Sequence, residues 1–178
     1  MAATNDEVAV IETKFGKIIL EFFADDAPKT VANFKKLARE GFYDGTTFHR
    51  VIPDFMIQGG DPLSKTDDRS KHGTGGPGYT IEAEIKRPHL RGTVATARLG
   101  DQVNPEKRSS GSQFFINVKD NHFLDGNYTV FGRVIQGMDV ADKISLVPRD
   151  RRDNPNERVE MKVRIMSRAE ALGSAPTP

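Results

Sequence analysis

Apolar residues cluster in many short runs, some of them alternating with polar residues, and glycine, proline or polar residues separate the runs. Near the N-terminus, VAVIE (8–12) and KIILEFF (17–23) flank the break TKFG and predict a β-hairpin. Further runs predict short strands: TTFHRVI (46–52), FMIQ (55–58), YTIEAEI (79–85), GTVATAR (92–98), QFFINV (113–118), YTVFGRV (128–134) and a closing RVEMKVRIM (158–166). This pattern favours an antiparallel sandwich or barrel, and periodicity alone does not decide between the two.

The period changes to that of a helix in APKTVANFKKLAREG (27–41). Asp26 is expected to cap this helix, Pro28 suits its first turn and Gly41 suits its stop. A stripe at helical spacing predicts its core-facing side: Val31, Phe34, Leu37 and Ala38. MDVADKISLV (138–147) predicts a second short helix, and the two helices would plug the open ends of the β structure.

Composition sets the general class of the protein. The 178 residues predict one domain, and 37% hydrophobic with 29% charged residues is an ordinary soluble balance. The net charge of +1 gives no reason to expect nucleic acid or a membrane as partner. The absence of cysteine excludes disulfides, thiol catalysis and cysteine metal sites. No secretion signal or membrane-spanning run is found, so we expect a cytoplasmic location. Nothing in the sequence demands more than a monomer.

Two polar, glycine- or serine-rich segments, 62–78 and 98–112, predict long surface loops that shape a groove. Within the first, GTGGPG (73–78) matches a dinucleotide-binding fingerprint letter for letter. That mechanism needs a strand before the glycines and a helix after them. Here polar residues precede and a strand-like run follows, so the stretch is interpreted as a glycine-rich loop.

Other candidate chemistry is sparse. The histidines, His49, His72, His89 and His122, show no zinc-ligand spacing, and no nucleophile elbow is present. A metal site or a serine triad built from scattered residues stays open at this point. Acidic residues interleave the basic ones in PRDRRDNPNERVEMKVR (148–164), which indicates a solvated loop rather than a nucleic-acid groove.

The stretch TTFHRVIPDFMIQGGD (46–61) places a fixed cation, Arg50, among apolar residues. Strand alternation predicts Phe48, Arg50 and Ile52 on one face, and likewise Met56 with Gln58. A buried arginine without a partner would be costly. From spacing alone, either a carboxylate partner or a position at the rim explains Arg50.

Several blocks together closely resemble the cyclophilin family of peptidyl-prolyl isomerases, in its bacterial-like single-domain form. The blocks are APKTVANF, FHRVIPDFMIQGGD, GTGGPG, GSQFFI and FLDGNYTVFGRVIQGMDV, and their order also matches. The resemblance runs from about Val8 to Met166. It divides the chain into an N-terminal extension (1–7), the isomerase domain (8–167) and a flexible C-terminal tail (168–178).

The resemblance implies a mainly β fold, a closed eight-stranded antiparallel β-barrel capped by two α-helices, with the active groove on its outside. Arg50 matches the catalytic arginine, and Gln58 matches a glutamine that binds the substrate backbone and helps to hold the arginine. The proline pocket would be formed by Phe55, Met56, Phe115 and Leu124. Gln113 matches a groove contact, and Ala95, Thr96 and Ala97 match a strand that pairs with the residues before proline.

Departures from the family pattern concern the rim of the groove. Phe123 stands where many members carry tryptophan, whose indole N–H binds cyclosporin, so weak cyclosporin binding is expected. Tyr128 stands where histidine is common, and Thr96 where asparagine is common. The 98–112 loop looks longer than in compact members.

The implied function is isomerisation of X–Pro bonds in peptides and in unfolded or folding proteins. No covalent bond breaks in this reaction, so we expect no nucleophile, no metal and no cofactor. A proline-binding chaperone module with little turnover is the alternative, and a scaffold that binds partners through its long loops is a third hypothesis.

Overall fold

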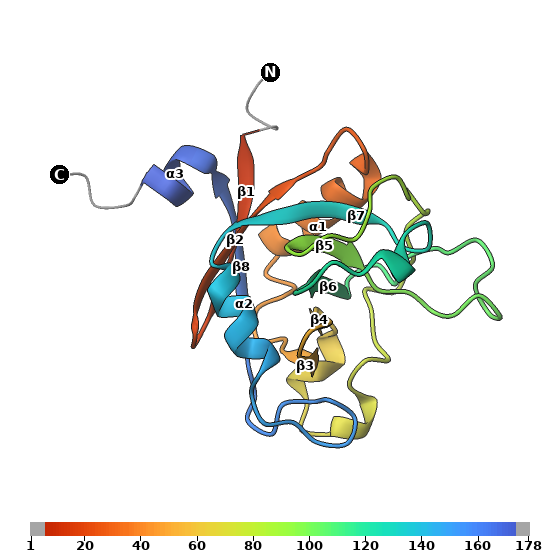
Figure 1. The fold of residues 1–178 in the computed structure, drawn as a ribbon, viewed down its shortest axis with the longest axis vertical. Helices are drawn as coiled ribbons and strands as arrows, with labels where there is room; N and C mark the ends of the chain where they lie inside the picture. Colours follow the sequence, from red (N-terminus) through yellow and green to blue (C-terminus); the bar gives the residue numbers. More distant parts are fainter. Residues whose placement is uncertain (1–5, 174–178) are drawn as a thin grey trace.

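The computed structural model describes residues 6–173, in which eight antiparallel strands form one sheet (Figure 1). The strands lie in the order β3-β4-β6-β5-β7-β2-β1-β8. Their bounds are β1 Glu7–Thr13, β2 Gly16–Phe22, β3 Phe48–Ile52, β4 Met56–Gly59, β5 Thr93–Thr96, β6 Phe114–Asn117, β7 Val130–Gln136 and β8 Lys162–Ser167. The helices are α1 Pro28–Arg39, α2 Met138–Ser145 and α3 Arg168–Gly173, with short 3₁₀ helices at Pro62–Lys65, Arg69–Lys71 and His122–Leu124. None of the helices described is long and apolar enough to cross a membrane.

The sheet curls into an open half-barrel, so the prediction of a closed barrel is wrong. β3 and β8 are its edges, and no ladder joins them in residues 6–173. The two edges approach at an isolated bridge between Thr47 and Glu160, where Phe48 N donates to Val159 O at 3.0 Å. Because β8 begins after this bridge and then pairs with β1 alone, the bridge does not extend into a ladder.

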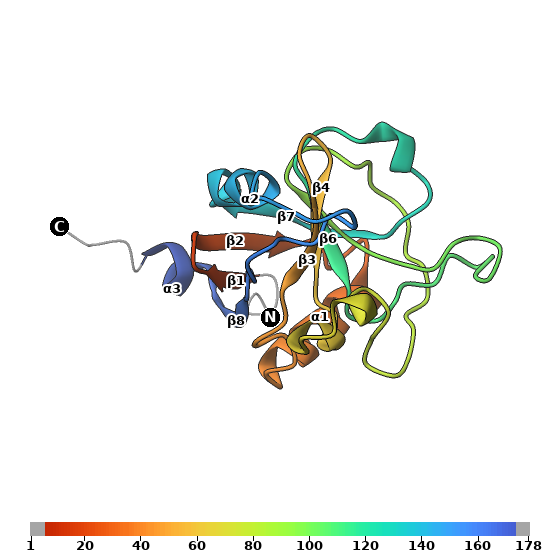
Figure 2. The ribbon, with the colours of Figure 1, turned by 90° about the horizontal axis from the view of Figure 1, so that it is seen from below.

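One apolar core fills the hollow of the sheet, and both predicted helices contribute to it. α1 and α2 lie on opposite sides of the strands in Figure 2. The predicted stripe of α1 is confirmed, because all four of its residues belong to the core. The helical contributions are Val31, Phe34, Leu37 and Ala38 from α1, with Val140, Ala141 and Ile144 from α2.

The N-terminus of α1 is capped from far away in the chain, and the predicted cap by Asp26 is wrong. Ala27 occupies the cap position without a side-chain hydrogen bond. Instead, the Glu84 carboxylate accepts from Lys29 N at 3.1 Å and from Thr30 N at 2.8 Å. Asp26 forms an ion pair with Arg87. A carboxylate at a helix N-terminus satisfies free N–H groups and complements the helix dipole.

The capping role of Glu84 also explains why the strand predicted at 79–85 is absent. Within this run, only Ile81 makes a bridge, with Ser109, and the rest is irregular. Glu84 N donates to Thr129 Oγ1 at 2.9 Å, so the segment is held by side chains and not by a ladder. Its alternating pattern is therefore no sign of sheet pairing.

The C-terminal range predicted as a flexible tail begins with a helix. In α3, Ala171 and Leu172 pack on an outer apolar cluster with Val8, Val10 and Ile19. Residues 174–178 of the predicted tail, and residues 1–5 of the predicted N-terminal extension, lie outside the described range.

We expect Glu84→Ala to lower the free energy of unfolding by about 1–2 kcal/mol, because it removes the cap of α1. Asp26→Ala is the matched control and should cost less, about 0.5 kcal/mol, since it removes a partly exposed ion pair. Urea unfolding followed by circular dichroism measures both. Equal losses for the two variants would contradict the assignment of Glu84 as the cap.

Candidate active site

A β-bulge places Arg50 on the outer face of the sheet. Phe48 is opposite Gly59 and Arg50 is opposite Gln58, so β3 carries one residue more than β4 in this interval. Phe48 consequently points into the core, fully buried, while Arg50 is exposed. The prediction that these two side chains share a face is wrong, because a bulge shifts the alternation by one residue. No carboxylate lies within ion-pair distance of Arg50 in residues 6–173.

Beside Arg50, the outer face carries a pocket with a volume of about 150 Å³. The cross-strand pairs Gln58–Phe115 and Ala95–Phe115 bring three strands together beneath it. A separate apolar cluster, distinct from the main core, forms its floor: Met56, Ala95, Phe115, Leu124 and Val130. The pocket is lined by Arg50, Phe55, Met56, Gln58, Ala97, Arg98, Phe115, Leu124 and Tyr128.

Most of the residues predicted from the family resemblance therefore meet at this one pocket. Ala95 lies in its floor, and Gln113 contacts Gln58. Phe123 is 70% exposed at the edge, with its ring 5.6 Å from that of Phe55. Thr96 is buried and lines a small cavity beside α1 instead.

The predicted pairing of a substrate strand with Ala95, Thr96 and Ala97 meets backbone groups that are already in use. β5 lies between β6 and β7 in the sheet. Thr96 N donates to Thr129 O at 2.9 Å, and Ala97 N donates to Gln113 O at 3.0 Å. Ala97 O accepts from Ser110 N at 2.9 Å. This role of β5 stays a prediction.

Gln58 is held by a chain of hydrogen bonds that ends in the glycine-rich loop. Gln58 Nε2 donates to Gln113 Oε1 at 3.0 Å, and Gln113 Nε2 donates to Gly73 O and Gly75 O at 3.1 and 2.8 Å. Buried Asp61 accepts from Gly73 N and so fixes the loop. A Cβ on Gly75 would lie only 2.4 Å from Asp61 Oδ1. The glycines thus let the loop approach Asp61, and the interpretation of 73–78 as a loop without a following helix is confirmed.

Phe115 is supported from behind by a buried histidine, which the sequence did not assign to the site. His89 is fully buried, and its ring stacks on Phe115 with centroids 5.8 Å apart. Burial lowers the pKa of His89, so the ring is uncharged at neutral pH. Asn117 Nδ2 lies 3.2 Å from His89 Nδ1 and donates to Thr93 Oγ1 at 2.9 Å. This buried network fixes the aromatic floor of the pocket.

Arg98 is the lining residue that the sequence analysis missed. Its guanidinium lies 4.7 Å from the centre of the Tyr128 ring, and it forms an ion pair with Asp101 at 2.9 Å. It also donates to Asn127 O at 2.6 Å. No local sequence pattern predicts this role, because it depends on contacts with Asn127 and Tyr128, which are distant in the sequence.

The two predicted loops form a groove, as expected. A hollow of about 680 Å³ lies between residues 73–80 and 97–110, and it shares Gln58 and Ala97 with the apolar pocket beside Arg50. Among the described residues, no group of three or more acidic or histidine side chains is arranged to hold a metal ion.

Comparisons with known proteins agree with this geometry. The family model "Cyclophilin type peptidyl-prolyl cis-trans isomerase/CLD" matches residues 8–167. A peptidyl-prolyl cis-trans isomerase of Synechococcus elongatus is 52% identical over 126 residues, which cover 70% of this chain and 78% of the relative. One from Schizosaccharomyces pombe is 40% identical over 149 residues, which cover 83% and 90%.

A solved structure shares the fold closely. It is a cyclophilin type peptidyl-prolyl cis-trans isomerase of Cryptosporidium parvum, crystallised in the presence of the dipeptide Ala-Pro. The TM-score is 0.80 at 30% identity, with 90% of this chain and 99% of that chain covered. The chain therefore belongs to the family of cyclophilin-type peptidyl-prolyl cis-trans isomerases, and it is an isomerase.

Proposed function

We propose that the pocket beside Arg50 holds the proline ring of an X–Pro peptide, and that Arg50 stabilises the twisted amide as the bond rotates. The observation that carries this proposal is an exposed guanidinium, without a carboxylate partner in residues 6–173, at the mouth of an apolar pocket. Structural arginines normally have an acidic partner. An arginine that is left free beside an apolar pocket is available to a substrate.

Rotation of an X–Pro bond can be accelerated by a guanidinium placed beside an apolar pocket, without any other catalytic group. Rotation about a peptide bond faces a resonance barrier of about 18–20 kcal/mol. In the twisted transition state, the proline nitrogen loses conjugation and its lone pair accepts a hydrogen bond, which the planar nitrogen does not. A donor aimed at that nitrogen binds the transition state more strongly than the substrate, and this difference is catalysis. Arginine suits the task because it stays charged and its donors have a fixed geometry.

The remaining residues have positioning roles in this proposal. Phe55, Met56, Phe115 and Leu124 hold the ring, while the preceding carbonyl swings. Gln58 is fixed by its hydrogen bond to Gln113 and would itself hydrogen-bond the substrate backbone. This role does not require a hydrogen bond between Gln58 and Arg50. No covalent bond breaks, so the mechanism uses no nucleophile, metal or cofactor.

The substrate class is supported by the relative crystallised with Ala-Pro. For this chain, we propose proline-containing peptides and unfolded or folding proteins as substrates, a monomeric state, and a cytoplasmic location. The alternative is a chaperone module that binds proline with little turnover. In the isomerase, Arg50 is needed for the rate of isomerisation; in the chaperone module, it contributes to binding alone.

Arg50→Ala should reduce kcat/KM for a short X–Pro peptide by about 100-fold or more, as removal of a transition-state donor does elsewhere. Arg50→Lys is the matched control, since it keeps the charge but loses the fork, and it should restore little. Turnover is measured in the cold, where the uncatalysed background is slow. Circular dichroism checks that each variant is folded. If folded wild type gives no acceleration, the binding module takes the place of the enzyme.

Wild type should bind cyclosporin with a dissociation constant in the micromolar range, about −8 kcal/mol, because Phe123 offers no donor. Phe123→Trp should tighten binding about tenfold, the value of one added hydrogen bond of ~1.4 kcal/mol. Fluorescence titration measures both, with Phe123→Tyr as a control that cannot place the indole N–H. Nanomolar binding by wild type would refute this expectation.

The rate of isomerisation should be constant between about pH 6 and pH 8, because arginine does not titrate there.

Burial lowers the pKa of His49, next to Arg50, from 6.5 to about 4. The contribution of neutral His49 to the free energy of unfolding is therefore present above pH 6.5 and is lost as the pH falls toward 4. Asp125 instead raises the pKa of exposed His122. Histidine NMR titration should show His122 titrating above 6.5 and His49 constant down to about pH 5. A titration of His49 near neutrality would contradict an uncharged His49 ring next to Arg50.

A further inference from the structure

A second cavity, of about 210 Å³, lies on the other side of Arg50 from the apolar pocket. Arg50 and Gln58 line both hollows, so the two share a wall. The second cavity otherwise has a different chemistry, since its lining contains no aliphatic or aromatic hydrocarbon side chain. It is formed by His49, Arg50, Gln58, Arg69, His72, Gly73, Asp150, Arg152 and Asn154.

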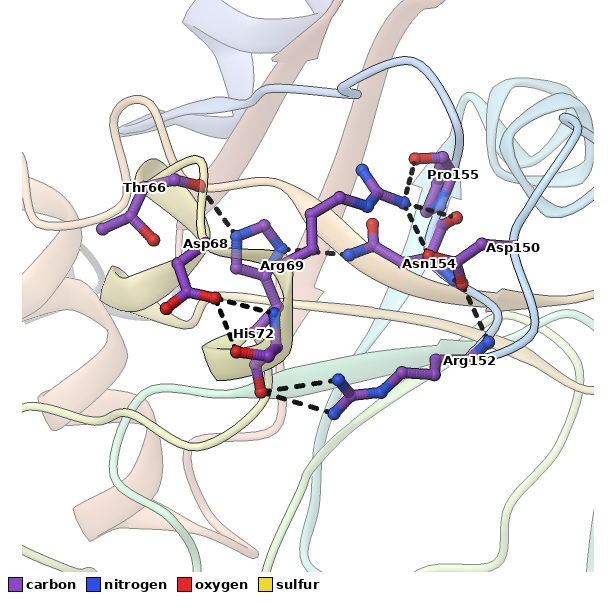
Figure 3. Close-up of polar contacts among 9 residues, drawn as sticks. Thr66, Asp68, Arg69, His72, Asp150, Arg152, Asn154 and Pro155 are labelled. Atoms are coloured by element: carbon purple, nitrogen blue, oxygen red, sulfur yellow. Dashed lines mark hydrogen bonds and ion pairs between the residues drawn. The ribbon is translucent and has the colours of Figure 1, made fainter.

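Two loops that are distant in the sequence are joined to form this cavity (Figure 3). Arg69 Nη2 donates to Asp150 Oδ2 at 2.9 Å, and to Asn154 O and Pro155 O at 3.0 and 2.9 Å. His72 Nε2 lies 2.9 Å from Thr66 O, which only accepts, so Nε2 donates. The side chains of Arg69 and His72 have their hydrogen-bond partners within the two loops, so these loops hold the wall of the cavity in one arrangement.

The second loop is also tied to β3 itself. Val51 N donates to Asp153 O at 2.8 Å, one residue beyond Arg50. The His72 ring is fixed on its other side by Asn154, whose Nδ2 lies 3.0 Å from His72 Nδ1. The position of the cavity relative to Arg50 is therefore set by hydrogen bonds, not by a freely moving loop.

The charges on this wall do not balance. Asp150 is its one lining carboxylate, and Arg69 occupies it. The backbone N of Arg152 donates to Asp150 Oδ1 at 2.8 Å, but its guanidinium reaches only Ser70 O, at 3.5 Å. Like Arg50, this guanidinium has no carboxylate within ion-pair distance in the part of the chain described. His49 adds no charge at neutral pH, because burial keeps its pKa near 4. Two guanidinium groups thus remain unmatched around one hollow.

We propose that this cavity is a subsite for an anionic group, a carboxylate or a phosphate, on the substrate segment next to the proline. Guanidinium groups bind both anions through paired N–H donors. Because Arg50 forms a wall of both hollows, the proline and the anion belong to one peptide. The anion then lies within a few residues of the proline, because the two hollows share Arg50 and Gln58 as walls.

This subsite rests on the proposed placement of proline beside Arg50. It makes the enzyme selective for acidic or phosphorylated proline-containing segments. The field of unmatched arginines also draws such segments toward the groove, and salt weakens this attraction.

The test compares matched X–Pro peptides that carry Gln or Glu, and Ser or phosphoserine, at each of the three positions before and after the proline. The measured quantity is the ratio of kcat/KM for the anionic peptide to that for its neutral partner, at low and high salt. Arg152→Gln removes an unmatched guanidinium from the cavity. Arg151→Gln is the control, because it removes the same charge from the adjacent exposed residue, which does not line the cavity.

At one position, wild type should prefer the anionic peptide about three- to tenfold, the range expected for one partly exposed charged contact. The ratio should fall close to one in Arg152→Gln and persist in Arg151→Gln. A preference confined to phosphoserine assigns the site to phosphate, and one that includes Glu assigns it to carboxylates as well.

Ratios near one at every position would overturn the proposal. So would an equal fall in both variants, which would indicate a diffuse surface charge instead of a subsite. If neutral peptides are not turned over at all, the proposed function fails on its own. Calorimetric binding of the same peptide pairs to the same variants then still decides for or against the anion subsite.

Discussion

One extra residue in β3 is the constraint on which the site depends. The bulge between Phe48 and Arg50 lets the same strand bury Phe48 and Val51 in the core and still present Arg50 outside. A regular strand would put Phe48 and Arg50 on one face, and either the core would lose an aromatic ring or a guanidinium would enter it. The irregular backbone therefore separates stability from chemistry within a few residues.

Near this bulge the sheet carries apolar side chains on both faces, and the two sets have different functions. The inner set, with Phe34 and Phe114, closes the core under α1. The outer set, with Phe115 above fully buried His89, forms a pocket that stays open. Polar networks fix the surroundings of this pocket: Asp61 acts through the glycine-rich loop and Gln113 on Gln58. The contact between His72 and Asn154 fixes the second cavity, which shares Arg50 and Gln58 with the pocket.

Local patterns predicted what local forces determine. The hairpin, the core stripe of α1 and the position of Pro28 all follow from periodicity and backbone preference, and the structure confirms them. The errors arose where a distant group decides: Glu84 caps α1 in place of Asp26, and thereby leaves 79–85 outside the sheet. The open edge between β3 and β8 and the stacking of His89 depend likewise on tertiary contacts. The site residues came from the family resemblance, which also left Arg98 out.

The order of the strands has a consequence for synthesis on the ribosome. β1 lies between β2 and β8, so β1 gains its second neighbour only when residues 162–167 emerge. The cap of α1 likewise waits for Glu84, 54 residues after Thr30. Contacts so distant along the chain close slowly and late. A nascent chain therefore stays incompletely folded in this domain until residues 162–167 have emerged and can pair with β1.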